Sequence, residues 1–224
     1  DSFVSDWGPG PAIRTAFEAE CGCELRLVGA GDGAALLARL QLEGARSTAD
    51  NATIDNNGTV TFVDSSTAGN ARLINHDGAT IDFSTSSGPG SDNRLSAGSI
   101  EGAGLYLLGA NELTVGSNNL STEFGGDISG VGGSLVKVGT GALTLSGNAS
   151  GLTGPTSIEE GTLAVTGELG GALNVRAAGR LQGTGTVGST TVAAGGTVAP
   201  GNSTGTLHIA GDYTQQAGSV YQVE

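Results

Sequence analysis

Two adjacent segments decide the fold: ATIDNNGTVTFVDSSTAGN at residues 52–70 and ARLINHDGATIDFSTSSGPG at residues 71–90. The second segment repeats the turn residues and the apolar positions of the first. Ile54 recurs as Ile74 and Gly58 as Gly78 after 20 residues, and then Val60 recurs as Ile81 and Phe62 as Phe83 after 21 residues. A repeat of this length predicts a solenoid, in which each repeat forms one coil that stacks on the previous one.

Short runs of alternating apolar and polar residues continue along the chain and predict strands with one buried face. The predicted inward-facing residues are Val60, Phe62, Ile81, Phe83, Leu143, Leu145, Leu163, Val165, Leu207 and Ile209. Thr, Ser, Asn and Asp take the outward positions and corners, and Gly takes corners that need a positive φ. The predicted fold class is therefore mainly β, a right-handed parallel β-helix (solenoid) over residues 51–224.

The composition agrees with a repetitive β architecture built from small residues. The 224 residues include 41 Gly but 5 Pro, which excludes collagen because collagen also needs abundant proline. The net charge is −13 and Lys137 is the only lysine, so we expect no nucleic-acid partner. No apolar run approaches the roughly 20 residues that span a bilayer, and the first residues show no signal peptide.

Residues 1–50 differ in character, since they hold both cysteines, the only tryptophan and a denser share of the charged residues. The pattern predicts a helix at 12–21 (AIRTAFEAEC), a strand at 23–29 (CELRLVG) and a helix at 33–44 (GAALLARLQLEG). One strand does not make the sheet that such helices pack on. The expectation is a short N-terminal α/β fragment joined to the solenoid.

The second of these helices suggests a role for the fragment. Leu36, Leu37 and Leu40 share one apolar face, and the first coil of a solenoid exposes an open core. We therefore expect this face to fold over the coil that contains Ile54 and Val60, as a cap. The alternative is that residues 1–50 form a loose, partly helical tail.

Three short motifs suggest enzymes or cofactors, but each lacks its structural context. GAGDGA at 29–34 matches a dinucleotide fingerprint without the second strand and acidic ribose ligand that the site needs. GNSTG at 201–205 matches the hydrolase elbow, with His208 nearby, but a strand pattern rather than a helix follows Ser203. GTGTVG at 183–188 opens no helix. We interpret the three as a strand-to-helix turn, a polar solenoid corner and a turn.

The acidic residues of the first coils suggest another possibility. Asp55, Asp64, Asp77 and Asp82 lie close in sequence, and Asp55 and Asp77 are predicted to align on stacked coils. Clustered carboxylates suit metal binding or the acid–base chemistry of a polysaccharide lyase. Solvated corner residues are the favoured interpretation, and neither a metal site nor a cofactor is predicted. Asn148 starts an N-x-S sequence that we interpret as turn chemistry.

Residues 1–50 resemble a known family in specific stretches: DSF and DWGPGP near the start, then FEAECGCEL and LLARLQLEGARSTAD. They are similar to the beginning of the mature thiamine-binding periplasmic protein of ABC importers. The resemblance implies that Asp1, Ser2 and Trp7 are thiamine-cleft positions. The family has two α/β lobes, and this segment departs from it by covering only part of one, so thiamine binding by the chain is not expected.

Residues 51–224 resemble a second family. GGSLVKVGTGALTLSGNASGLTGPTSIEEGTLAVTG at 132–167 looks like the autotransporter-associated β-strand repeat of bacterial passenger domains, and the segment from Gly179 onward looks like a passenger shortly before its membrane barrel. The resemblance implies a β-helical passenger segment that is exported through the periplasm and the outer membrane to the cell surface or medium. Its outer-membrane β-barrel translocator is expected outside this chain.

The predicted function is therefore structural: a surface-exposed, non-catalytic stalk segment, with adhesion or virulence as its setting and an unidentified host or cell-surface receptor as partner. Two alternatives remain open. One is a remnant thiamine-binding component of an ABC importer, which would place the chain in the periplasm, and the other is a passenger-borne esterase or polysaccharide lyase. The abrupt change near residue 50 indicates a chimeric chain.

Overall fold

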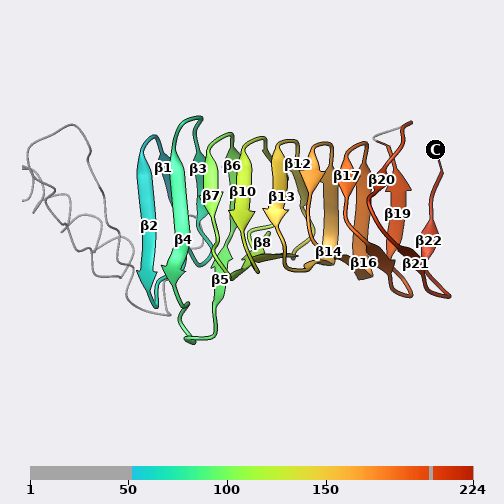
Figure 1. Cartoon of the computed structure of the whole chain (residues 1–224), viewed down its shortest axis with the longest axis horizontal. Helices are drawn as coiled ribbons and strands as arrows, with labels where there is room; N and C mark the ends of the chain where they lie inside the picture. The colour runs from blue at the N-terminus through green and yellow to red at the C-terminus, as the bar shows by residue number, and fades with distance from the viewer. Residues whose placement is uncertain (1–51, 202–203, 224) are drawn as a thin grey trace, which may run out of the picture.

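The computed structural model describes residues 52–201 and 204–223, which form a parallel β-solenoid of about eight turns. Figure 1 shows the turns stacked side by side along the long axis, in sequence order from β1 to β22. All strand pairs between named strands are parallel, and the described residues contain no helix. The predicted mainly β solenoid is confirmed.

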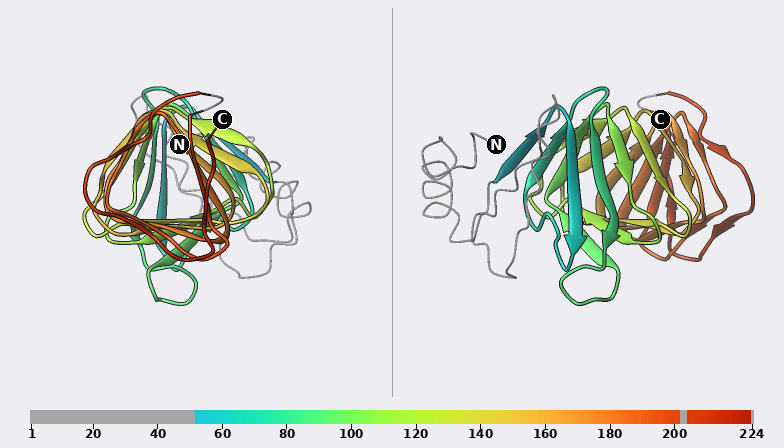
Figure 2. Two further views of the ribbon diagram at one scale, coloured as in Figure 1. Left: turned by 90° about the vertical axis from the view of Figure 1, so that its right-hand side faces the viewer. Right: turned by 60° about the vertical axis from the view of Figure 1, so that its left-hand side comes forward.

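Each turn of the solenoid has three faces, which give the triangular outline seen along the axis in Figure 2. The chain visits them in a fixed order, which we call the first, second and third face. The first face contains β1 (Thr53–Asn56), β3 (Arg72–Asn75), β6 (Ser99–Gly102), β9 (Thr122–Phe124), β12 (Ala142–Leu145), β19 (Thr197–Pro200) and β22 (Val220–Tyr221).

The second face is an eight-stranded sheet. Its strands are β2 (Thr59–Asp64), β4 (Thr80–Ser86), β7 (Leu105–Leu107), β10 (Asp127–Gly130), β13 (Asn148–Leu152), β15 (Glu168–Leu169), β17 (Thr186–Val187) and β20 (His208–Ile209).

The third face contains β5 (Arg94–Ala97), β8 (Glu112–Val115), β11 (Ser134–Lys137), β18 (Thr190–Val192) and β21 (Tyr213–Gln215). Two long strands, β14 (Thr156–Val165) and β16 (Leu173–Gly183), run from the third face across a corner onto the first face of the next turn. They join the first and third faces into one 14-stranded sheet.

The register of the first two turns corrects one part of the predicted repeat. Ile54 lies opposite Leu73 rather than Ile74, so the repeat on the first face is 19 residues. On the second face Val60 lies opposite Ile81, as predicted. The corner after β3 contains two more residues than the corner after β1, and this difference lengthens the repeat from 19 to 21.

The solenoid core runs without interruption through the turns. The predicted inward residues are buried, except that Leu207 and Ile209 in the last turn are half-buried and pack against the core. The rings of Phe62 and Phe83 stack at 4.3 Å between centroids, and those of Tyr106 and Phe124 meet edge to face at 4.9 Å. Stacked aliphatic and aromatic columns of this kind supply the main stabilising term.

A column of glycines forms the corner between the first and second faces. It consists of Gly104, Gly126, Gly147, Gly167 and Gly185. In each of the last four, a Cβ atom would lie 1.9–2.2 Å from the carbonyl oxygen of the preceding glycine in the column. That carbonyl accepts a backbone N–H from the next turn, as Gly147 does from Glu168 at 3.0 Å. Corner glycines with positive φ also occur, including Gly78 and Gly102, but this column needs glycine for space.

Two buried asparagines tie the first turns together. The Asn56 amide donates to Asn75 Oδ1 at 2.8 Å, and the Asn75 amide donates to the Leu105 carbonyl at 3.0 Å. Both side chains are buried, so these bonds satisfy polar groups that would otherwise be costly inside the core. The column ends at Gly102, which lies opposite Asn75 in the next turn.

Tyr106 is a buried exception, because its hydroxyl has no hydrogen-bond partner among the described residues. Burial and the nearby Glu101 carboxylate raise the pKa of this phenol. An unpaired buried hydroxyl costs free energy, so we expect Tyr106→Phe to raise the free energy of unfolding by about 1 kcal/mol in urea denaturation. Tyr213→Phe, whose exposed hydroxyl donates to Gln215, is the control and should change little. A destabilised Tyr106→Phe variant would contradict the prediction.

The predictions for residues 1–50 lie outside the described residues. They comprise the helices and strand of the N-terminal fragment and the cap formed by Leu36, Leu37 and Leu40. Among the residues that the structure describes, no helix has the length and apolar character to cross a membrane.

Candidate functional site

The structure describes few of the residues that the sequence singled out for chemistry. The weak thiamine-cleft candidates Asp1, Ser2 and Trp7, and the possible nucleophile Ser203, lie outside the described residues. His208 starts β20 and is exposed. The glycine motif at 183–188 is a turn between two strands, as predicted.

The acidic residues of the first turns do not gather into one site. Asp55 lies opposite Ile74 rather than aligning with Asp77, so that prediction is wrong, for the same reason that shifted Ile54. Asp55 Oδ1 instead lies 2.6 Å from His76 Nε2 on the exposed surface. Asp82 accepts a bond from the Ser84 backbone N–H at 2.8 Å. Within residues 52–201 and 204–223, no group of acidic, His or Cys side chains has the geometry of a metal site.

Asn148 behaves as the predicted turn residue. Its Oδ1 accepts bonds from the Ser150 backbone N–H at 2.9 Å and from the Ser150 hydroxyl at 2.6 Å. This local capping explains an Asn-x-Ser sequence without glycosylation.

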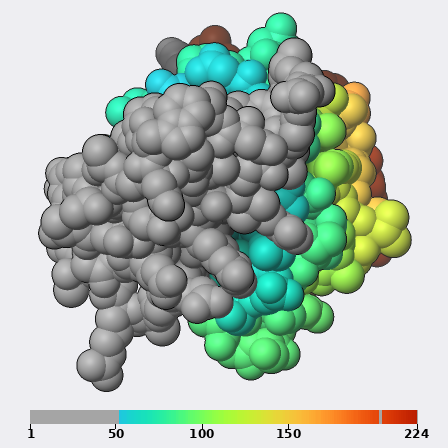
Figure 3. All heavy atoms as spheres, turned by 90° about the vertical axis from the view of Figure 1, so that its left-hand side faces the viewer, coloured from blue at the N-terminus to red at the C-terminus, as the bar shows by residue number. Residues whose placement is uncertain are grey.

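One loop stands out from the otherwise smooth body of the solenoid. The loop between β4 and β5, residues 87–93, projects from the corner after the second face in Figures 1 and 2, and the green bulge in Figure 3 contains it. Backbone bonds close it, from Asn93 N to Ser87 O at 2.9 Å and from Ser91 N to Gly88 O at 3.0 Å. Ser91 and Asn93 have positive φ, so the loop has a defined and locally strained shape. It is the main protruding feature of the described surface.

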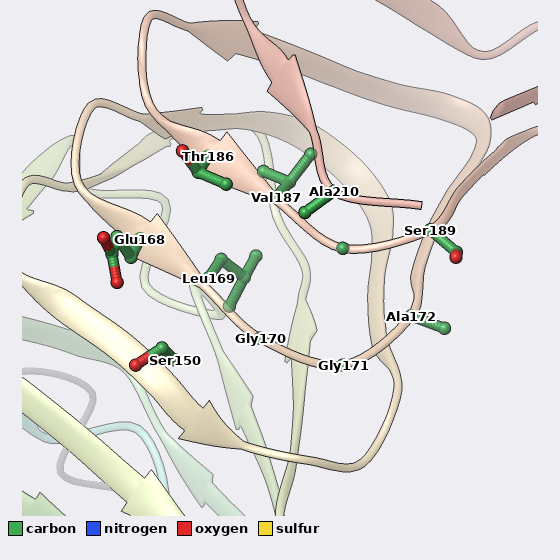
Figure 4. A pocket seen from close by; sticks show the side chains of 11 residues that line it. Ser150, Glu168, Leu169, Gly170, Gly171, Ala172, Thr186, Val187, Ser189 and Ala210 are labelled. Atoms are coloured by element: carbon green, nitrogen blue, oxygen red, sulfur yellow. The ribbon is translucent and has the colours of Figure 1, made fainter. Parts of the chain in front are cut away.

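A shallow groove crosses the second face near the C-terminal end (Figure 4), with a volume of about 390 Å³. It spans the ends of β13, β15 and β17 and is floored by the backbone of Gly170, Gly171 and Gly188. Polar side chains line it: Ser150, Glu168, Thr186 and Ser189. Such a surface offers hydrogen-bond donors and acceptors to a polar ligand.

The groove does not have the composition of a hydrolytic centre. The residues that line it include hydroxyls and one carboxylate, Glu168, but neither His, Cys nor Lys among the described residues. A nucleophile needs an adjacent base, and retaining or inverting glycosidases need a pair of carboxylates. The groove therefore fits contact with a partner better than covalent chemistry.

Lys137 is a functional-looking residue that the sequence analysis did not place. Its side chain is buried at the end of β11, and Nζ donates to the carbonyls of Val138 at 2.7 Å, Gly139 at 2.8 Å and Glu160 at 3.2 Å. Burial lowers the pKa of Lys137, and the charge of Glu160 opposes that shift. Because Glu160 belongs to the next turn, the ammonium links two turns. The single lysine in an acidic chain was the available signal, but the sequence does not show that it points inward.

A comparison with protein families supports the second resemblance. The family model described as Passenger-associated-transport-repeat matches residues 135–165, which run from β11 through β12 and β13 to the end of β14. The "Extracellular serine protease" of Serratia marcescens is 44% identical over 84 residues, which cover 38% of this chain and 8% of that protein.

Curated relatives support the first resemblance as well. The "Thiamine-binding periplasmic protein" of Salmonella typhimurium is 62% identical over 50 residues, and that of Escherichia coli is 60% identical over the same length. Each match covers 22% of this chain but only 15% of the relative, so the chain spans a small part of these proteins.

No solved structure shows a significant match to this chain. The sequence comparisons and the solenoid nevertheless agree on a chimeric description. The chain joins an N-terminal segment similar to thiamine-binding periplasmic proteins to a β-solenoid that carries an autotransporter passenger repeat.

Proposed function

We propose that residues 51–224 are a structural, surface-exposed stalk segment of an autotransporter passenger, and that this segment makes adhesive contacts without catalysing a reaction. The observation that carries the proposal is the unbroken parallel ladder and core through about eight turns, combined with the passenger repeat at 135–165. A body of this kind resists bending because each turn is hydrogen-bonded to its neighbours along three faces.

Adhesion is assigned to the outer features of the solenoid. The loop at 87–93 projects from the body, and the groove by Glu168 offers polar groups on the second face. A rigid scaffold that presents loops and polar grooves is a common arrangement for binding. The receptor is proposed to be a host or cell-surface molecule, and the proposal does not depend on a cofactor.

Location and domain organisation follow from the same reasoning. The passenger segment is proposed to reach the cell surface through the periplasm, carried by an outer-membrane β-barrel translocator. Residues 1–50 are proposed to be a separate unit, a truncated α/β fragment of the periplasmic-binding-protein kind that caps the first coil. Its similarity to thiamine-binding periplasmic proteins supports this assignment of residues 1–50.

The test displays the full chain on bacteria through a fused outer-membrane β-barrel translocator. We expect antibody labelling and added protease to reach the chain on intact cells, and retention in the periplasm would contradict the stalk proposal. Adhesion of these cells to cultured host cells should fall several-fold when Pro89 and Asp92 in the loop are changed to Ala. The matched control changes the exposed, distant Val131 to Ala and should adhere normally.

The same chain, purified, tests the absence of catalysis. Short-chain nitrophenyl esters and acidic polysaccharides should be left intact, with Ser203→Ala behaving as the unmodified chain. Calorimetry with thiamine and its phosphates should give no saturable heat at micromolar concentrations. Turnover that disappears in Ser203→Ala would establish an esterase, and one-to-one thiamine heat would establish ligand binding.

A further inference from the structure

The last turn of the solenoid leaves its core columns uncovered. Val198 is buried, and the residue that stacks on it, Tyr221, is 52% exposed. In the same way Tyr213 stacks on buried Thr190 and is 40% exposed. Burial and the neighbouring Tyr221 both raise the pKa of Tyr213, which places the two phenols near each other across the open end. The end therefore presents an aromatic and aliphatic surface, completed by the half-buried Leu207 and Ile209.

The backbone of this turn is also half-paired. Each of β20, β21 and β22 pairs with a single strand of the preceding turn. The N–H groups of Ala210, Gln216 and Val220 donate back to that turn. In a strand the alternate residues direct their N–H and C=O groups to the opposite edge, so those of Ile209, Gln215 and Tyr221 are directed at the open end. Exposed edges of this kind pair readily with another strand unless charges or proline prevent it.

Charge supplies the argument for what covers the end. The chain carries a net charge of −13, yet residues 204–223 contain a single carboxylate, Asp212, and neither Lys, Arg nor Pro. Two copies that meet along the sides of the solenoid bring carboxylates together. Two copies that meet at this end do not, because the end is nearly free of charge.

We propose that the C-terminal turn, residues 204–223, is a docking surface for the same turn of a second copy of this chain. The two solenoids meet end to end about a twofold axis perpendicular to their long axes. That symmetry reverses the strand direction, so strands of one copy pair antiparallel with strands of the other and the tyrosines of both copies are buried together. Tyrosine suits this position because its ring is buried while its hydroxyl keeps a polar partner.

Sedimentation equilibrium of the full chain, between about 1 and 100 µM, tests the proposal. We expect a monomer–dimer equilibrium, with Tyr213→Lys/Tyr221→Lys weakening the dimer at least about 30-fold. The matched control, Leu120→Lys/Val131→Lys, also converts two exposed apolar residues to lysine but lies in mid-solenoid loops, and it should dimerise like the unmodified chain. Circular dichroism of each variant verifies that the solenoid is folded.

Hydrogen exchange keeps the proposal testable if the double variant fails to fold. Amides of residues 209–221 in the unmodified chain should become more protected as the concentration rises through the dimer range. Three results would overturn the proposal: a monomer at 100 µM, open-ended growth that indicates head-to-tail stacking, or protection that stays independent of concentration in this turn.

Discussion

Replacing Gly167 with alanine is expected to lower the free energy of unfolding by about 3 kcal/mol, at the upper end of the usual cost of overpacking. The added Cβ would lie 1.9 Å from the carbonyl oxygen of Gly147 and 2.8 Å from the carbonyl carbon of Ser146. Both are backbone atoms, so no side chain can rotate away. Relief requires the two turns to separate, which weakens the bond from Glu168 N to Gly147 O.

Urea denaturation followed by circular dichroism measures this effect. Gly58→Ala is the matched control, because a Cβ there meets nothing within 4 Å. We expect that control to be neutral or slightly stabilising, since alanine reduces the freedom of the unfolded chain. Equal stability of the two variants would show that the glycine column is not required for close stacking of the turns.

Replacing Lys137 with methionine is expected to destabilise the solenoid by about 3 kcal/mol. Methionine fills a similar volume but donates nothing to the carbonyls of Val138, Gly139 and Glu160. Each carbonyl left unpaired in a buried place costs free energy, and this cost outweighs the relief of no longer burying a charge. Gly116 and Gly161 approach Nζ closely, so the cage leaves little room for rearrangement.

Arg176→Met is the matched control for charge, since Arg176 is an exposed cation whose guanidinium lies 3.5 Å from Glu159. A surface ion pair of this kind contributes little, so the control should melt in urea at nearly the same concentration as the unmodified chain. If Lys137→Met matched the control, the buried ammonium would be a tolerated passenger rather than a link between turns.

The sequence alone determined the class of the fold and most of its core. The alternation of Val60 with Phe62, or of Leu143 with Leu145, has a period of two, and this period alone assigns them to the inner face of a strand. The repeat of such strands near every 20 residues then requires stacking, because a single coil cannot bury its own apolar face. The resemblance at 132–167 was equally local, and the family match at 135–165 confirms it.

The tertiary structure decided what depends on register and on the third dimension. Two extra residues in one corner moved Ile54 opposite Leu73 and separated Asp55 from Asp77, and a sequence repeat does not reveal corner lengths. The inward direction of Lys137 and the space requirement of Gly167 arise only when a neighbouring turn is in place. A sequence specifies which residues prefer burial through their chemistry, whereas distances between turns are set by the packing of backbones that are far apart in the chain.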